Sequence, residues 1–151
     1  MTYVEIHRSF SLKGDLIVGP KYEFTGETKL WGDSTLHRIR RLRDGKLGGW
    51  IESEDNLSQE GNCWAYGDSK IFNTNKVIGN AIILDSMIRS DSIIKDNALI
   101  RESIIVNCQL GGYTSVNESY ISNTKLDSDE YHRRYNIDAT RGYIDESNIS
   151  Q

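Results

Sequence analysis

A short repeat of aliphatic residues constrains the fold of this chain more than any other feature. Between residues 65 and 126 an aliphatic anchor recurs every five or six positions without a break in spacing. The twelve anchors are Ala65, Ile71, Val77, Ile83, Ile88, Ile94, Ile100, Ile105, Leu110, Val116, Ile121 and Leu126. An amphipathic helix needs apolar spacings of three and four, so the period excludes a helix over this stretch.

A small residue stands two positions before every anchor. These residues are Cys63, Ser69, Asn75, Ala81, Ser86, Ser92, Ala98, Ser103, Cys108, Thr114, Ser119 and Thr124. Residues two apart in a strand share a face, so each small residue points to the same interior as its anchor. Gly, Asn and Asp recur just before the small residues and supply the turns. Short strands that alternate with turns predict an all-β solenoid, in which successive coils stack at about 4.8 Å.

The number of sides follows from how the units align. Three columns bring Ser69, Ser86, Ser103 and Ser119 into one column, whereas four columns scatter these serines. We therefore expect a three-sided coil of about four turns, although five-residue units are more usual in four-sided solenoids. The two cysteines then fall into different columns, which predicts two reduced core thiols and no disulfide.

Three regions follow from the position of the repeat. The solenoid is expected over residues 61–127, an N-terminal β cap over 1–60, and a helix or tail over 128–151. Caps are expected because the end strands of a solenoid otherwise expose their edges. In the cap, "TYVEIHRSF", "DLIVG", "KYEFTG" and "LHRIRRLR" are typical of short strands. At the other end, "SDEYHRRYNI" starts with Ser128 and places Tyr131 and Tyr135 four apart, which predicts a short helix.

Two kinds of repeat resemble known families. The units GNCWAY, GDSKIF and GNAIIL resemble the hexapeptide repeats of left-handed β-helices, and SIIVN, CQLGG, ESYIS and NTKLD resemble pentapeptide repeats. The stretch "TLHRIRRLRDGKLGGWIESEDNLSQEGNCWAYGDSKI" resembles an uncharacterised family of phage and prophage β-solenoid proteins. In that family a GGWIESE-type segment leads into G-N-A-x-V units, and the resemblance covers roughly residues 21 to 107. It implies a left-handed β-helix with a small N-terminal cap in a phage-related protein, and it brings no active site with it.

The sequence contains few residues in a pattern that is typical of a catalytic site. The hexapeptide resemblance implies an acyltransferase as one alternative, and such enzymes use a histidine that projects from a coil as the general base. This chain has only His7, His37 and His132, all outside residues 63 to 126. Zinc-ligand spacings and nucleotide-binding fingerprints are absent from the sequence as well. We expect a protein that is not an enzyme and has no metal or cofactor. A trimeric acyltransferase that uses His37 or His132 stays as an alternative.

One segment of the chain has a local excess of positive charge. With 22 acidic and 18 basic residues the net charge is only −4, so the whole chain resembles neither a nucleic-acid binder nor an acidic mimic of DNA. The segment "HRIRRLR" nevertheless carries a strip of four arginines, which could bind phosphates or carboxylates. They are Arg38, Arg40, Arg41 and Arg43. The alternative is a solvated cap strand balanced by the neighbouring acids Glu52, Glu54 and Asp55.

The residues between the inward pairs should face water, yet many are apolar. The outward set is Trp64, Tyr66, Ile82, Leu84, Met87, Ile93, Leu99, Ile104 and Tyr120. Three columns place Met87, Ile104 and Tyr120 on one outer face and most of the others on the preceding face. Exposed apolar patches with aromatic and Met anchors are typical of protein interfaces. The alternatives are that the cap or the C-terminal tail covers these residues, or that they pair two or three copies of the chain.

These observations together predict a non-enzymatic binding protein. Its outer solenoid face, flanked by Arg89, Lys95 and Arg101, would contact a host protein, or a second or third copy of the chain. The resemblance implies one concrete form, an inhibitor of a host defence system such as a CRISPR effector. Nucleic-acid or nucleotide binding through the arginine strip stays as an alternative. We expect no membrane contact and a cytoplasmic location, because the sequence has no leader-like segment and no apolar run long enough to span a bilayer.

Overall fold

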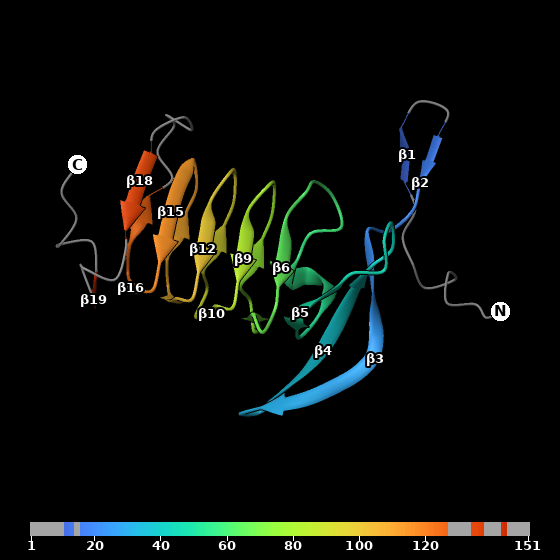
Figure 1. The fold of residues 1–151 in the computed structure, drawn as a ribbon, viewed down its shortest axis with the longest axis horizontal. Helices are drawn as coiled ribbons and strands as arrows, with labels where there is room; N and C mark the ends of the chain where they lie inside the picture. Colours follow the sequence, from blue (N-terminus) through green and yellow to red (C-terminus); the bar gives the residue numbers. More distant parts are fainter. Residues whose placement is uncertain (1–10, 14–15, 127–133, 138–142, 145–151) are drawn as a thin grey trace.

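The five- and six-residue period folds into three parallel sheets around one core, as the computed structural model shows (Figure 1). The structure describes residues 11–13, 16–126, 134–137 and 143–144. Sheet I contains β5 (Leu47–Ile51), β7 (Lys70–Ile71), β10 (Met87–Arg89), β13 (Ile104–Val106), β16 (Tyr120–Ser122) and β19 (Tyr143–Ile144). Sheet II contains β8 (Lys76–Val77), β11 (Ile93–Ile94), β14 (Gln109–Leu110) and β17 (Lys125–Leu126). Sheet III contains β6 (Trp64–Tyr66), β9 (Ile82–Leu84), β12 (Leu99–Arg101), β15 (Tyr113–Asn117) and β18 (Arg134–Ile137). The three-sided β-solenoid predicted from the spacing is confirmed.

The solenoid is longer than predicted. Sheet III has five strands because β18 pairs in parallel with β15, beyond the expected end at residue 127. The helix predicted for "SDEYHRRYNI" is therefore wrong for its last four residues, Arg134–Ile137, which form this strand. An extended segment can bond to the open edge of the last coil, and a helix cannot. The start of the predicted helix, Ser128 and Tyr131, lies outside the described residues.

Inside the coils, the serine column forms a ladder of hydrogen bonds. The hydroxyl of Ser69 accepts from the backbone N–H of Ser86 at 3.3 Å, and the Ser86 and Ser103 hydroxyls accept from Ser103 and Ser119 at 3.0 Å. Each hydroxyl also donates to a nearby carbonyl of its own coil. The ladder satisfies buried polar groups that the tight turns take out of sheet pairing. Asn75, the largest of the small residues, bonds in the same way to the N–H of Ser92 at 2.6 Å.

The N-terminal strands extend sheet I. The hairpin of β3 (Tyr22–Trp31) and β4 (Ser34–Arg41) pairs antiparallel with β5, and β5 pairs in parallel with β7. A separate hairpin joins β1 (Ser11–Lys13) and β2 (Leu16–Val18). The strands predicted from "DLIVG", "KYEFTG" and "LHRIRRLR" are confirmed, while the whole of "TYVEIHRSF" lies outside the described residues. Figure 1 shows the β3–β4 hairpin projecting below the first coils.

The GGWIESE-type segment joins the hairpin to the first coil. A Cβ at Gly48 would lie 2.6 Å from the ring of Trp64, and one at Gly49 would lie 2.7 Å from the carbonyl oxygen of Ser69. Only glycine allows so close an approach. The segment ends in a 3₁₀ turn, η2 (Glu54–Asn56), where Asn56 is fully buried. Within the described part of the chain no helix is long and apolar enough to cross a membrane.

Candidate functional site

The outward apolar residues fall on the faces that the three-column alignment predicts. On sheet III, Trp64 pairs with Ile82 and Ile82 pairs with Leu99. On sheet I the register aligns Met87, Ile104 and Tyr120 in one row. Ile93 differs from the other members, because on sheet II it lies between Lys76 and Gln109.

Trp64 does not belong to the surface. Its side chain is 1% exposed, although its position in β6 predicted an outward side chain. The ring of Tyr22 packs edge-on against it at 6.0 Å, and the guanidinium of Arg41 lies 5.3 Å from its centre. Because Gly48 has no side chain, β5 approaches the ring closely and helps to cover it. Trp64 is therefore a core residue of the capped end and not an interface residue.

The rest of the sheet III face is half-buried. Tyr66, Ile82, Leu84 and Leu99 are all of intermediate exposure. Tyr66 and Ile82 pack against the main core, and the ammonium of Lys46 lies 5.7 Å from the centre of the Tyr66 ring. This face is apolar, but its side chains are only partly exposed to solvent.

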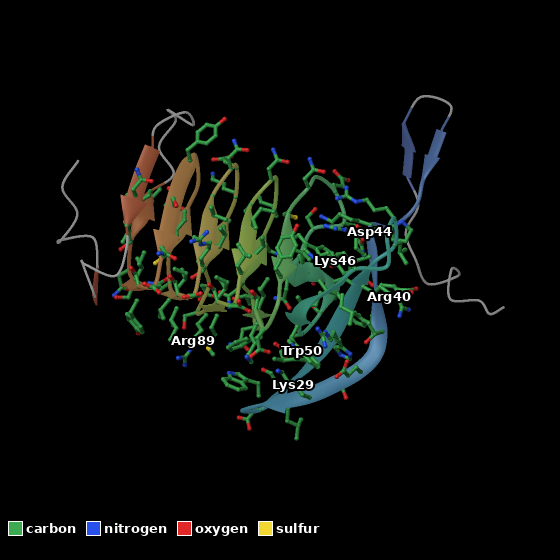
Figure 2. All side chains as sticks on the ribbon, viewed as in Figure 1. Lys29, Arg40, Asp44, Lys46, Trp50 and Arg89 are labelled. Atoms are coloured by element: carbon green, nitrogen blue, oxygen red, sulfur yellow. The ribbon has the colours of Figure 1, made fainter. Side chains whose placement is uncertain are left out.

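The sheet I face is partly covered by the β3–β4 hairpin. The ammonium of Lys29 lies 4.2 Å from the centre of the Trp50 ring (Figure 2). The ammonium of Lys70 lies 4.6 Å from the centre of the Trp31 ring. Leu36 of the hairpin is fully buried in a second small core, which also contains Trp50, Phe72 and part of Met87. The cap therefore covers the start of this face, which agrees in part with the alternative that the chain covers its own apolar surface.

Beyond the hairpin the apolar row stays open. Ile104 and Tyr120 are each 37% exposed and Met87 is half-buried. At the tip of the hairpin, Leu30 is 75% and Trp31 is 41% exposed. We call the row of Met87, Ile104 and Tyr120 the apolar row. Together with the hairpin tip it holds four of the seven large apolar side chains that are exposed in the described chain; the other three are Leu42, Leu47 and Ile78.

Two shallow depressions lie along this surface. The larger, of about 460 Å³, is lined by Asp68, Lys70, Asp85, Ser86, Met87, Glu102, Ser103 and Ile104. The smaller, of about 300 Å³, lies at the hairpin tip and is lined by Trp31, Gly32, Asp33, Ser34, Phe72, Asn73 and Arg89. Figure 2 shows Arg89 on the side of the solenoid from which the hairpin projects. Both depressions are open, as expected for a surface that binds another macromolecule and not a small ligand.

A row of acidic residues, which was not predicted from the sequence, lies beside the apolar row. Asp85, Glu102 and Glu118 each stand two positions before a member of the apolar row, and all three are exposed. Asp68 holds the same place one coil earlier, two positions before Lys70. The signal was present in the sequence, because each acid directly precedes a serine of the internal ladder. We call Asp85, Glu102 and Glu118 the acidic row.

The first coil differs from the others because Asp68 is paired. Its carboxylate lies 3.3 Å from the ammonium groups of both Lys29 and Lys70. Burial acts to raise the pKa of Asp68, but the hydrogen bonds from Lys70 and Lys29 outweigh it and lower the pKa. Within the described part of the chain, none of the acidic row forms an ion pair of this kind.

The arginine strip does not form one anion site. Arg40 pairs with Glu23 at 2.7 Å, Arg41 pairs with Asp44 at 2.8 Å, and Arg38 lies 3.8 Å from Glu27. The hydrogen bond from Arg41 lowers the pKa of Asp44 to about 2. The strip also diverges, because Arg38 lies over Trp50 of sheet I whereas Arg41 lies over Trp64 of sheet III. Arg43 is exposed on the loop that follows.

The prediction that Glu52, Glu54 and Asp55 balance the charge of the arginine strip is wrong. The acids that pair with the strip lie instead on β3 and in the loop after β4. Glu52 accepts the backbone N–H of Asn73 at 2.7 Å, and Glu54 accepts from the side chain of Gln59 at 2.9 Å. These two carboxylates therefore bond to neighbouring residues of the first coils and not to the arginine strip.

The described histidine and the two cysteines pack against other residues of the fold. The ring of His37 is stacked on Phe24 at 4.4 Å; His7 and His132 lie outside the described residues. Cys63 and Cys108 are buried and free, and burial raises the pKa of the Cys108 thiol. Among the described residues no group of three or more His, Cys, Asp or Glu side chains could hold a metal ion.

The half-buried cation of Lys21 lies at the capped end. The ammonium of Lys21 donates to the carbonyl oxygen of Cys63 at 2.7 Å, and burial lowers its pKa. It also donates to the carbonyl oxygens of Glu60 and Gly61 at 3.4 and 3.3 Å. These bonds close the end of the first coil, where the backbone has no further strand to pair with.

Comparison with known proteins identifies no family for this chain. No family model and no curated protein matches this chain. The fold therefore defines the class by itself: a three-sided β-solenoid whose first sheet is extended by an N-terminal β-hairpin.

Proposed function

We propose that this chain is a non-enzymatic binding protein that docks a protein partner on the outer face of sheet I. One observation carries the proposal: the apolar row stays open beyond the hairpin, with Ile104 and Tyr120 each 37% exposed. A solenoid holds such a row rigidly, so little conformational entropy is lost on binding. The hairpin tip, with Trp31 at 41% exposure, adds an aromatic anchor at one end.

The resemblance of the GGWIESE-type segment to phage and prophage proteins supports one concrete form of this function. In that form the partner is a host protein in the cytoplasm, and the chain inhibits a defence system such as a CRISPR effector. The pairing of Arg38, Arg40 and Arg41 with acids of their own chain argues against nucleic-acid binding as the main activity.

Site-specific photo-crosslinking tests the proposed function. A photo-reactive phenylalanine analogue replaces Ile104 on sheet I, or Gln109 on sheet II as the control, since both positions are exposed. We expect position 104 to crosslink one defined protein in host cells and position 109 to crosslink none. A crosslink to a second copy of the chain would also support a protein interface at this face. Equal products at both positions, or none at position 104, would reject it.

A further inference from the structure

We infer that the partner of sheet I is an amphipathic helix that carries lysine or arginine along one edge of its apolar face. The inference rests on the proposed function, because it names the partner of the same surface. Its basis is that the apolar row and the acidic row run side by side. In three successive coils an acid is followed two residues later by an apolar side chain. A partner that covers one row must therefore meet the other.

The spacing of the rows fits a helix that lies along the solenoid axis. Coils repeat at about 4.8 Å, so equivalent side chains on successive coils are separated by that distance. Side chains on one edge of an α-helix recur at about 5.4 Å per turn. The mismatch is about 0.6 Å per coil, and over the three coils of the acidic row it stays within the reach of a lysine or arginine side chain.

Charge favours a basic partner over a second copy of this chain. Asp85, Glu102 and Glu118 are exposed, and the basic residues closest in sequence to the two rows are Lys70, Arg89 and Arg101. Lys70 is 7% exposed and already pairs with Asp68, which leaves Arg89 and Arg101 against three carboxylates. Two copies packed face to face would therefore bring an excess of negative charge together, and like charges at an interface oppose binding.

The hairpin sets the position of the helix along the row. Trp31 and Leu36 of the hairpin cover the first coils and form a wall beside Met87. Beyond that wall the depression of about 460 Å³ is lined by members of both rows, Asp85 and Glu102 of the acidic row and Met87 and Ile104 of the apolar row. One end of the partner helix therefore packs against the hairpin, and the rest of the helix follows the open coils.

Three synthetic peptides provide the first test. Each has about 18 residues and a leucine face at helical spacing; one carries lysine along one edge of that face, one carries glutamate there, and one has the lysine sequence scrambled. NMR titration of the full chain should show the lysine peptide shifting the signals of Ile104 and Tyr120, and leaving Gln109 unchanged. We expect the glutamate and scrambled peptides to bind at least 10-fold more weakly. Equal binding of the glutamate peptide would overturn the inference.

Neutral variants of the chain provide the second test. The triple variant Asp85→Asn/Glu102→Gln/Glu118→Gln removes the acidic row, and Glu54→Gln/Asp55→Asn/Glu60→Gln removes the same charge from exposed positions outside sheet I. The first variant should lose about 10-fold or more in affinity for the lysine peptide and much of its salt dependence. The control variant should stay within about 2-fold of the wild type. An unchanged affinity in the first variant would overturn the inference.

Crosslinking separates the two proposals. A partner captured at position 104 that the acidic-row variant still binds would support the proposed function and reject the basic helix. A crosslink between two copies of the chain at position 104 would also support the proposed function and reject the basic helix. If position 104 captures nothing, the proposed function itself fails.

Discussion

Replacing Asn56 with alanine is expected to lower the free energy of unfolding by about 3–5 kcal/mol. The Asn56 side chain is fully buried and ties two segments together. Its Oδ1 accepts from the backbone N–H groups of Glu52 and Ser53 at 3.0 and 2.9 Å. Its Nδ2 donates to the carbonyl oxygens of Asn73 and Asn75 at 3.0 and 2.9 Å. Alanine leaves at least three of these groups without their partner, at about 1–3 kcal/mol each.

The measurement is urea unfolding followed by circular dichroism. Asn62→Ala is the matched control, because Asn62 is exposed on the loop before β6 and its loss should change stability by no more than about 0.5 kcal/mol. If both variants unfold at the same urea concentration, Asn56 does not hold the first coil to the next one.

The second large effect is expected from Gly48→Ala, with a loss of about 1–3 kcal/mol through overpacking. The new methyl group would lie 2.6 Å from the Trp64 ring, 2.8 Å from Ile39 and 2.9 Å from the carbonyl oxygen of Ala65. The ring is buried and the carbonyl belongs to the backbone, so neither can move without opening the capped end. We therefore expect the hairpin to loosen from the first coil.

Tryptophan fluorescence detects this opening. In a Trp31→Phe background the remaining indoles are Trp50 and Trp64, which are both buried. Gly48→Ala should shift their emission to longer wavelength and increase quenching by iodide. Leu47→Ala is the control, because Leu47 is 46% exposed and should leave both signals unchanged. An unshifted spectrum with wild-type stability in Gly48→Ala would mean that the close contact at Gly48 is not needed.

The coil geometry could be predicted because it is periodic. Small and aliphatic residues alternate at a fixed offset, so the sequence indicated the interior, the three sides and the outward rows on sheets I and III. The structure confirms the serine column as a hydrogen-bonded ladder that starts at Ser69 and runs through Ser86, Ser103 and Ser119. Each of these features depends only on neighbours along the chain and on the coil above or below.

The period fails where an insertion interrupts it. Ile137 pairs with Val116, 21 residues earlier, whereas Val116 lies 16 residues after Ile100. The longer connection hides the extra coil, and the spacing of Tyr131 and Tyr135 favours a helix locally. Strand β18 forms because the open edge of β15 offers backbone partners that local spacing does not reveal.

The candidate site depends on contacts between distant segments. The sequence indicated the strands of the hairpin, but a register shift in β3 between Phe24 and Thr28 accompanies the bend that brings Trp31 over Lys70. The partner of Arg40 also follows from pairing, because Glu23 lies directly opposite it on β3. Trp64 was predicted at the surface since nothing in the local pattern shows that Tyr22 and Gly48 cover it.

The central claim is that sheet I, and not sheet III, binds the partner, and affinity measurements on matched double variants test it most directly. Ile104→Lys/Tyr120→Lys changes sheet I, and Leu84→Lys/Leu99→Lys makes the same change on sheet III while it leaves Ile82, which packs against the core, in place. Against the protein captured at position 104, we expect the first variant to lose about 100-fold or more in affinity, since it places charge among the anchors of the interface. The second variant should stay within about 3-fold of wild type. The opposite result, with binding lost only in the sheet III variant, would contradict the account and move the interface to the face of Leu84 and Leu99.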